Sequence, residues 1–246
     1  NQQRGQIHFK DGKFYFYQAV EMEEPIKKES KIYAGIDLGI KRLIAIKTSN
    51  GEEKLIGSKR HFKQWNYYTN LIAEEQSELA EINRKCSKRL SKLFRLRSKW
   101  QNNLYNNLVS KAFRFLRRNN ISHIFIGDVQ GIRENKDWGR KGNKMLHNYW
   151  TYDIAYHKLS NKSEEYGMSY YRDTEEDSSS KCPVCGDIDR RNKKDRIFIC
   201  HLCGHFEHRD IVGATNILDN GMCSHLTGSV HQDEAILLRG CRNATA

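Results

Sequence analysis

The first third of the chain alternates apolar and polar residues in short runs, a pattern that predicts β-strands. Asp11-Gly12 and Asn50-Gly51 each separate two of these runs, and such dipeptides are typical of hairpin turns. The predicted strands cover residues 6–9, 13–17, 32–40, 43–46 and 54–56. We expect the last three to form an antiparallel meander, joined to the first hairpin by a polar linker over residues 21–30.

From residue 62 to residue 118, apolar side chains recur every three or four positions, which is the period of an amphipathic helix. We expect two long helices, or a helical hairpin that turns within residues 85–99. Further on, the pattern predicts a strand over 123–126, a polar loop over 131–143, a helix over 150–165, a strand over 168–171 and a helix over 210–218. The helix over 150–165 should bury Tyr152, Ala155, Tyr156 and Leu159.

Four of the seven cysteines form two Cys-x-x-Cys pairs, Cys182 with Cys185 and Cys200 with Cys203. Two such pairs place four thiolates at the corners of a tetrahedron, the geometry typical of Zn²⁺, although the spacer of 14 residues is one short of the usual range. Disulfides in a secreted protein are the alternative, but nothing else in the chain indicates an oxidising compartment. We predict a structural zinc ribbon over residues 181–204, with no ligand position open for catalysis.

Composition restricts the function further. The chain has 246 residues, with 42 Lys and Arg against 30 Asp and Glu, which gives a formal net charge of +12. This excess favours a polyanionic partner, and nucleic acid fits best. Mean hydropathy is −0.80, and no run of about 18 apolar residues is present, so the sequence predicts no membrane span.

Eight cations fall in the helical segment with no acid among them: Arg84, Lys85, Lys88, Arg89, Lys92, Arg95, Arg97 and Lys99. Adjacent like charges on a helix repel by a few tenths of a kcal/mol per pair. A phosphate backbone nearby would relieve that repulsion. A solvated helix face is the alternative, and we favour nucleic-acid contact.

The predicted order of strands and helices is that of an RNase H-like fold, and three aspartates fall where such a fold needs acids. Asp37 lies in the first strand of the meander, Asp128 ends the fourth strand, and Asp210 opens the last helix. A lone Asp among Ile and Leu is costly to bury unless it is paired or binds metal. Taken singly, each could be a turn or cap residue. Together they suit two Mg²⁺ ions and phosphodiester hydrolysis.

Three features together resemble one known family. They are Gly35-Ile36-Asp37-Leu38-Gly39, the four-cysteine ribbon, and Arg209-Asp210-Ile211-Val212-Gly213-Ala214-Thr215-Asn216-Ile217. Over about residues 32–220 the chain is similar to TnpB, the transposon-encoded RNA-guided nuclease related to compact type V CRISPR effectors. The resemblance implies an α/β, RNase H-like (RuvC-type) nuclease domain with a helical insertion and an inserted zinc ribbon that helps to hold the target.

The same resemblance implies an RNA-guided, Mg²⁺-dependent DNA endonuclease of the prokaryotic cytoplasm and nucleoid, with guide RNA and target DNA as partners. Asp37 and Asp210 would bind the metal ions, and Asp128, Glu175 or both would complete the catalytic set. The implied parts are the end of an upstream β-barrel region (1–30), RuvC-like part I (31–60), a basic helical hairpin (61–120), RuvC-like part II (121–180), the zinc ribbon (181–204), RuvC-like part III (205–222) and a tail whose lack of pattern permits disorder (223–246).

The chain departs from the family pattern at two positions. Gly127 replaces the family's Glu at the end of the fourth strand, which leaves only Asp128 there. Some relatives supply this acid from the strand before the ribbon, ahead of a Thr-Ser pair, and by that match Glu175 is the best replacement and Glu176 the next. His208 replaces the family's acid before Arg209, and it could alter metal affinity or pH dependence.

Two other functions stay open. Because Glu is lost at position 127, the chain could be a nuclease-inactive, RNA-guided DNA-binding repressor of the same family. Retention of both Asp37 and Asp210 weighs against that interpretation, since an inactive site has no need of them. The other is a guide-independent, RuvC-type accessory protein of transposition.

Overall fold

The computed structural model describes residues 5–10, 12–21, 23–40, 42–128, 139–174, 178–188 and 196–226. At its centre is a five-stranded sheet with the strand order β5-β4-β3-β6-β7. Its strands are β3 (Tyr33–Asp37), β4 (Ile44–Thr48), β5 (Glu53–Ile56), β6 (His123–Asp128) and β7 (Ser169–Thr174). The first three pair antiparallel, as the sequence predicts, and β6 pairs parallel with both β3 and β7. The sheet is therefore mixed.

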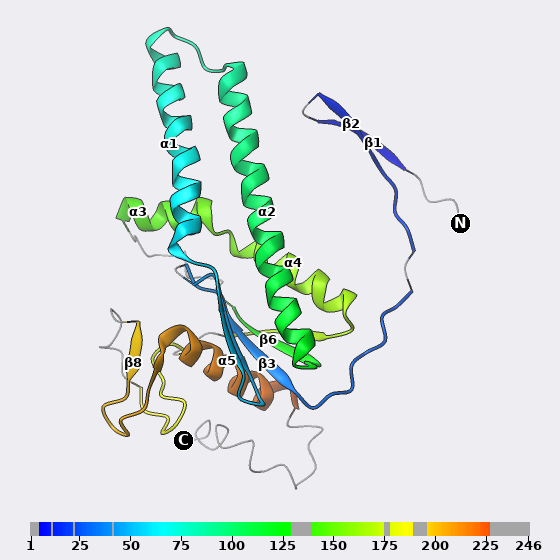
Figure 1. Cartoon of the computed structure of the whole chain (residues 1–246), viewed down its shortest axis with the longest axis vertical. Coiled ribbons are helices and arrows are strands. Elements are labelled where there is room, and N and C mark those ends of the chain that lie inside the picture. The colour runs from blue at the N-terminus through cyan, green and yellow to red at the C-terminus, as the bar shows by residue number, and fades with distance from the viewer. Residues whose placement is uncertain are drawn as a thin grey trace.

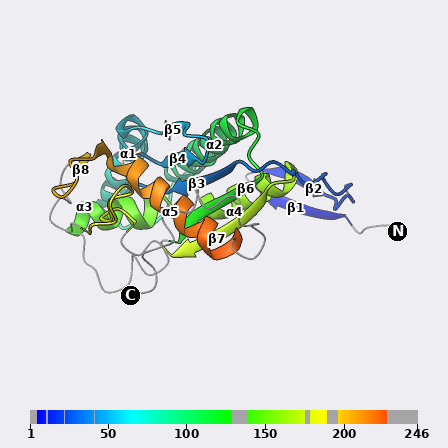
Figure 2. The same ribbon diagram turned by 90° about the horizontal axis from the view of Figure 1, so that it is seen from below.

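Helices cover both faces of this sheet (Figures 1 and 2). α2 (Lys88–Arg118) and α4 (Tyr152–Glu165) pack on one face, and α5 (Arg209–Leu226) crosses the other. The four α4 residues expected inside are all buried. Strand side chains alternate between the two faces. In β6, Ile124 and Ile126 join the core under α2 and α4, whereas Phe125 packs against α5.

α1 (Lys59–Glu81) and α2 form a helical hairpin that projects beyond the sheet (Figure 1). The connection covers residues 82–87, so the turn begins before the predicted 85–99 range. Asn83 adopts a positive φ of 54°, and Ser87 caps α2 by accepting a hydrogen bond from the Leu90 N–H at 2.9 Å. The Ser87 hydroxyl also donates to buried Glu75 of α1 at 2.7 Å, which fixes the place where α2 starts.

Two further predicted boundaries, of the loop and of the tail, are wrong. Residues 139–143, expected in a loop, belong to α3 (Gly139–Lys144), which continues into a π-helical turn, η1 (Met145–Tyr149). Gln101 of α2 donates to the carbonyls of Asn148 and Tyr149 at 3.0 and 2.8 Å, a tertiary contact that the local sequence does not reveal. The expected tail over 223–246 starts too early, because α5 continues to Leu226, which is still buried. The rest of the expected loop and tail, residues 131–138 and 227–246, lies outside the described residues.

The predicted N-terminal hairpin is confirmed. β1 (Gln6–Lys10) and β2 (Lys13–Tyr17) pair antiparallel and stand apart from the central sheet (Figure 1). The linker that follows is tied to the sheet end, where the Lys28 N–H donates to the Gly167 carbonyl at 3.0 Å. Within the described residues, no helix is both long and apolar enough to cross a membrane.

Candidate functional site

Close packing of β3 against α5 brings Asp37 and Asp210 to the same region. Gly35 of β3 lies so near α5 that a side chain there would clash with the backbone of Ala214 and Leu218. Gly213 of α5 also permits this close packing, because a Cβ at this position would lie only 2.9 Å from Asp37 Oδ2. Asp210 lies one helical turn before Gly213. The two aspartates predicted to bind metal therefore both lie near the start of α5.

Asp210 is held by two neighbouring side chains. Arg196 Nη1 donates to Asp210 Oδ2 at 3.0 Å, and His208 Nδ1 accepts the Asp210 backbone N–H at 3.2 Å. The Asp210 side chain is 20% exposed, so it is reachable by small ions. Sequence reasoning missed Arg196, because only the folded ribbon brings it back to the start of α5.

Asp128 faces the other side of the sheet. Its carboxylate accepts a hydrogen bond from Arg172 Nη2 at 2.8 Å. The guanidinium carbon of Arg172 lies 4.0 Å from the ring centroid of Tyr156, which belongs to α4. Because α4 and α5 cover opposite faces, the structure does not bring Asp128 together with Asp37 and Asp210.

Gly127 occupies the position beside Asp37 on the α5 face. Gly35 pairs with Phe125 in the parallel β3–β6 ladder, so the next positions on that face are Asp37 and Gly127. Gly127 is buried, and its carbonyl accepts the Tyr156 hydroxyl at 2.7 Å. Position 127 therefore supplies no carboxylate to the site. The sequence-based alternatives, Glu175 and Glu176, lie outside the described residues.

Asp173 is a further carboxylate on this face that sequence reasoning missed. It pairs in register with Gly127, and its Oδ1 lies 3.1 Å from His225 Nε2 near the end of α5. His225 stacks on Tyr171 with a centroid distance of 4.4 Å. Asp173 is thus used to dock the C-terminal part of α5, far along the helix from Asp210.

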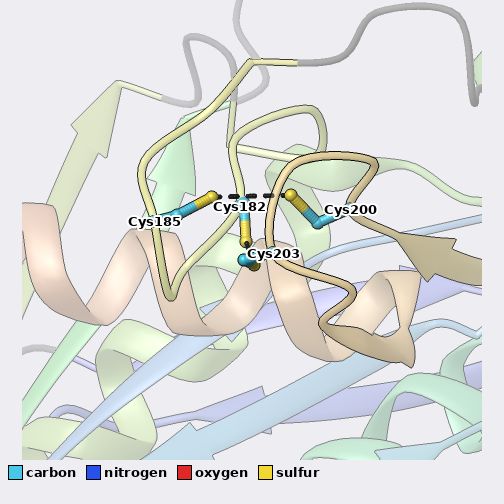
Figure 3. Close-up of side chains that lie close together, drawn as sticks. All are labelled: Cys182, Cys185, Cys200 and Cys203. Carbon is cyan, nitrogen blue, oxygen red and sulfur yellow. Dashed lines mark hydrogen bonds between the residues drawn. The ribbon is translucent and has the colours of Figure 1, made fainter.

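The four paired cysteines converge as predicted (Figure 3). Their sulfurs lie within 4.8 Å of one another, with Sγ–Sγ distances of 3.7 Å for Cys182–Cys203 and 3.5 Å for Cys185–Cys200. All four are free thiols, which excludes the disulfide alternative. A tetrahedron of sulfurs about 2.3 Å from a zinc ion has edges of about 3.8 Å, so the cluster fits such an ion. Within the described part of the chain, no other group of three or more potential ligands comes this close.

Local backbone geometry favours the thiolate form of one of these cysteines, Cys200. Hydrogen bonds from the backbone N–H groups of Cys203 and Leu202 lower the pKa of Cys200 to about 7, although burial opposes that shift. Burial raises the pKa of Cys182. A cation at the centre of the cluster would favour the thiolate form of all four.

The cysteine ribbon, residues 178–188 and 196–208, is anchored to α5. Two short strands, β8 (Ile197–Ile199) and β9 (Phe206–His208), pair antiparallel, so the ribbon ends four residues later than predicted. Phe198 is buried against Cys182, Cys200 and Val212. The Asn216 side-chain amide donates to the carbonyls of Ser178 and Lys181 at 2.6 and 2.8 Å. These contacts hold the ribbon beside Asp210.

The eight predicted nucleic-acid-binding cations lie at the turn of the helical hairpin and along α2. Two of them are engaged within the protein. Arg89 Nε lies 3.0 Å from Glu75 Oε2, and Arg97 lies over the rings of Trp65 and Phe94 at 5.6 and 5.3 Å. Lys88, Lys92 and Arg95 share one side of α2 and line an open hollow of about 490 Å³ together with Cys86, Ser87 and Ser91.

Comparison with known proteins finds matches to two parts of the chain. The family model OrfB_IS605, described as a probable transposase, matches residues 17–133, and the model of the Cas12f1-like TNB domain matches residues 152–217. The chain is 29% identical to the TnpB-like protein ORF457 of Acidianus two-tailed virus, over 81% of this chain and 43% of the relative. It is 35% identical to the CRISPR-associated endodeoxyribonuclease Cas12f1 of Sulfoacidibacillus thermotolerans, over 31% of this chain and 18% of the relative.

Solved structures show the same fold. A CRISPR-Cas12f ternary complex matches with a TM-score of 0.62 and 18% identity, over 87% of this chain and 44% of the solved one. A Cas12f1-sgRNA-target DNA complex matches with a TM-score of 0.60 and 17% identity, over 86% and 55% of the two chains. The chain thus spans about half the length of these proteins, or less. The sequence motifs, the two family matches and the TnpB-like relative together support a TnpB family protein.

Proposed function

We propose that the chain is the RuvC-type, RNase H-like nuclease part of an RNA-guided DNA endonuclease. The observation that carries this proposal is the approach of β3 to α5 at Gly213, which sets Asp37 beside the start of the helix that Asp210 opens. Two carboxylates from a central strand and a flanking helix offer the hard oxygen ligands that Mg²⁺ takes. The mixed sheet with helices on both faces agrees with an RNase H-like topology.

In this proposal Asp37 and Asp210 hold Mg²⁺ at the edge where β3 meets α5. The ions, when bound, would activate water and stabilise the leaving oxygen of a phosphodiester. Arg196 fixes the orientation of Asp210 through its hydrogen bond of 3.0 Å. The cysteine ribbon, which we propose binds one structural Zn²⁺, holds Arg196 in place and carries no catalytic ligand.

The second catalytic carboxylate is the open point of the site. Glu175 is our first candidate, because it is the best match to the acid that some relatives supply from the strand before the ribbon. Asp128 is the second candidate, but its side chain would have to leave Arg172 and turn from the α4 side of the sheet to the α5 side. Cleavage assays of Glu175→Gln and Asp128→Asn distinguish the two candidates. A variant that still cleaves DNA shows that the residue it replaces is not the second catalytic carboxylate.

Guide RNA and target DNA are the proposed partners. One of the matched solved structures is a complex of Cas12f1 with sgRNA and target DNA. For this chain, the proposal is supported by the net charge of +12 and by the free side of α2 that carries Lys88, Lys92 and Arg95. A heteroduplex or a displaced strand would lie along this side, bound through its phosphates.

A nuclease-inactive, RNA-guided DNA-binding protein is the second candidate function, and Gly127 is the observation that favours it. The experiment that separates the two is cleavage by the longer protein that contains this chain. We expect Mg²⁺-dependent cutting by the wild type, loss of cutting in Asp37→Asn and Asp210→Asn, and unchanged DNA binding in both. Binding without any cutting by the wild type would favour the inactive protein instead.

A further inference from the structure

The middle of α2 exposes three asparagines, which we call the amide row. Asn102, Asn103 and Asn106 are all exposed, whereas Leu104 and Tyr105 between them are buried. None of the hydrogen bonds among the described residues involves Asn102 or Asn103. Asparagine is among the poorer helix formers, because its side-chain amide competes for backbone hydrogen bonds. Three asparagines on an exposed side within two turns therefore indicate a use outside the fold.

The amide row continues a line of cations on the same side of α2. Residues three or four apart share one side of a helix, and Lys92, Arg95 and Lys99 precede Asn102 and Asn106 at these spacings. The helix rises about 21 Å between the first and the last of them. Ammonium and guanidinium groups only donate hydrogen bonds, which suits phosphate. An amide both donates and accepts, so the amide row suits a ligand group that does the same.

The opposite side of α2 is covered at this level, where α4 packs against it (Figure 1). The Thr151 N–H, just before α4, donates to the buried Tyr105 hydroxyl at 2.6 Å. Lys158 of α4 donates to Asn106 Oδ1 at 2.7 Å, which leaves the NH₂ group of Asn106 for an outside partner. A ligand can therefore reach the amide row from one side, which suits a shallow surface better than a deep groove that surrounds the helix.

Two groups of a nucleic-acid duplex both donate and accept hydrogen bonds, the base edges and the ribose 2′-hydroxyl. Base edges change with sequence, whereas in guide-directed recognition base pairing reads the sequence and the protein holds the backbone. The 2′-hydroxyls are displayed in the wide, shallow minor groove of an A-form duplex. The groups and the shape thus favour an RNA strand over B-form DNA.

We propose that the amide row binds 2′-hydroxyls of an RNA strand in an A-form duplex, while Lys92, Arg95 and Lys99 bind phosphates of the same duplex. The cations supply affinity for any nucleic acid, and the amides select a duplex that contains RNA over a DNA duplex. The inference rests on the proposed RNA-guided function, and it adds the residues by which this chain distinguishes RNA from DNA.

The test compares binding of an RNA–DNA hybrid and of a DNA duplex of the same sequence, each of about 20 base pairs, by fluorescence anisotropy. The chain carries Asp210→Asn in every case, so that no strand is cut. We expect Asn102→Ala with Asn103→Ala to weaken binding of the hybrid roughly five- to fifty-fold, the range for two lost hydrogen bonds, and to leave binding of DNA within about twofold. Asn70→Ala with Asn161→Ala is the matched control, since both residues are exposed, on α1 and α4, and the net charge again stays the same.

Two further ligands identify the group that is bound and its source. A hybrid with a 2′-fluoro RNA strand keeps the A-form without the hydroxyl, so it should bind more weakly than the unmodified hybrid to the Asp210→Asn chain and no more weakly to the double variant. An all-RNA duplex is compared with the hybrid, and the ligand that loses more affinity in the double variant identifies the source of the strand.

The melting temperature separates this contact from a structural role. Alanine is the better helix former, so both double variants should melt at an unchanged or higher temperature. An unchanged affinity for the hybrid, an equal loss for DNA, or an equal loss in the control would overturn the amide proposal while leaving the nuclease proposal standing. Failure of the Asp210→Asn chain to bind any of the duplexes would contradict both proposals.

Discussion

At the scale of single residues, two glycines and two aspartates decide the geometry of the site. Gly35 and Gly213 let β3 and α5 approach closely, and Asp37 and Asp210 then share one edge. The sequence was sufficient to single out both aspartates, because a carboxylate inside an apolar strand is unusual and because both aspartates lie within the motifs that resemble the family. It could not predict which way Asp128 points, since that depends on Arg172 and Tyr156 from two other elements.

Gly213→Ala should impair the site without unfolding the protein. The added methyl would lie 2.9 Å from Asp37 Oδ2, so the carboxylate must move, while alanine improves helix propensity by up to about 1 kcal/mol. We expect cleavage to fall roughly ten- to hundred-fold with the melting temperature unchanged or raised. Gly35→Ala is the contrasting variant, because its methyl meets the α5 backbone and should lower the melting temperature. Full activity in Gly213→Ala would show that Asp37 need not stay in place.

Asp219→Asn should stabilise the chain at neutral pH. Burial raises the pKa of Asp219 from 3.8 to about 6, although Lys181 opposes the shift. Between these values the folded chain binds a proton that the unfolded chain has released, so stability falls as pH rises. We expect a gain of about 3 kcal/mol at pH 7, shrinking to nothing below about pH 4, in urea unfolding curves. Acid removes metal from the wild type and from Asp219→Asn alike, so the difference between their free energies of unfolding reports on this carboxyl alone. A gain in stability that does not change with pH would contradict the explanation.

At the scale of elements, the cysteine ribbon and the helical hairpin are the two insertions beside the sheet. The spacing of the cysteines predicted their convergence, because two knuckles of fixed geometry leave little freedom. The turn of the hairpin and helix α3 were predicted less well. Their positions depend on Glu75 with Ser87 and on Gln101, which are contacts between segments distant in the sequence.

Chelation should unfold the ribbon. We expect about one zinc ion to be released per chain by a strong chelator, together with increased hydrogen exchange over residues 181–188 and 196–208. Because Phe198 packs against Val212 of α5, protection at the start of α5 should also decrease. A metal-free preparation whose ribbon exchanges as slowly as the untreated one would contradict a structural metal. Protection of β4 provides the internal reference.

The exposed side of α2 should bind phosphate. We expect Lys92→Glu with Arg95→Glu to weaken RNA and DNA binding at least tenfold and to reduce the slope of log affinity against log salt by about two. Lys158→Glu with Lys162→Glu on α4 makes the same change in net charge and should have a much smaller effect. An equal loss in both double variants, measured by fluorescence anisotropy over a salt series, would indicate general attraction instead of a defined surface.

At the scale of the whole molecule, the net charge of +12 conceals two regions of opposite charge with different tasks. The helical hairpin carries Lys88, Lys92 and Arg95 along an open hollow, whereas the start of α5 gathers carboxylates, one of which Arg196 binds. A basic frame around an acidic centre is what a nuclease needs, because it must attract a polyanion and still hold cations at the scissile bond. Gly127 stands where the family pattern has an acid, so this position adds no carboxylate to the acidic centre.

Guide-directed cutting is the measurement that tests the central claim most directly. RNA that co-purifies with the protein containing this chain would be sequenced, and DNA matching that RNA would be incubated with the complex and Mg²⁺. We predict cleavage of the matched DNA, none of a scrambled duplex, and none by the Asp210→Asn complex. Cleavage of both duplexes alike, or robust cleavage by Asp210→Asn, would contradict the assignment of an RNA-guided nuclease centred on Asp37 and Asp210.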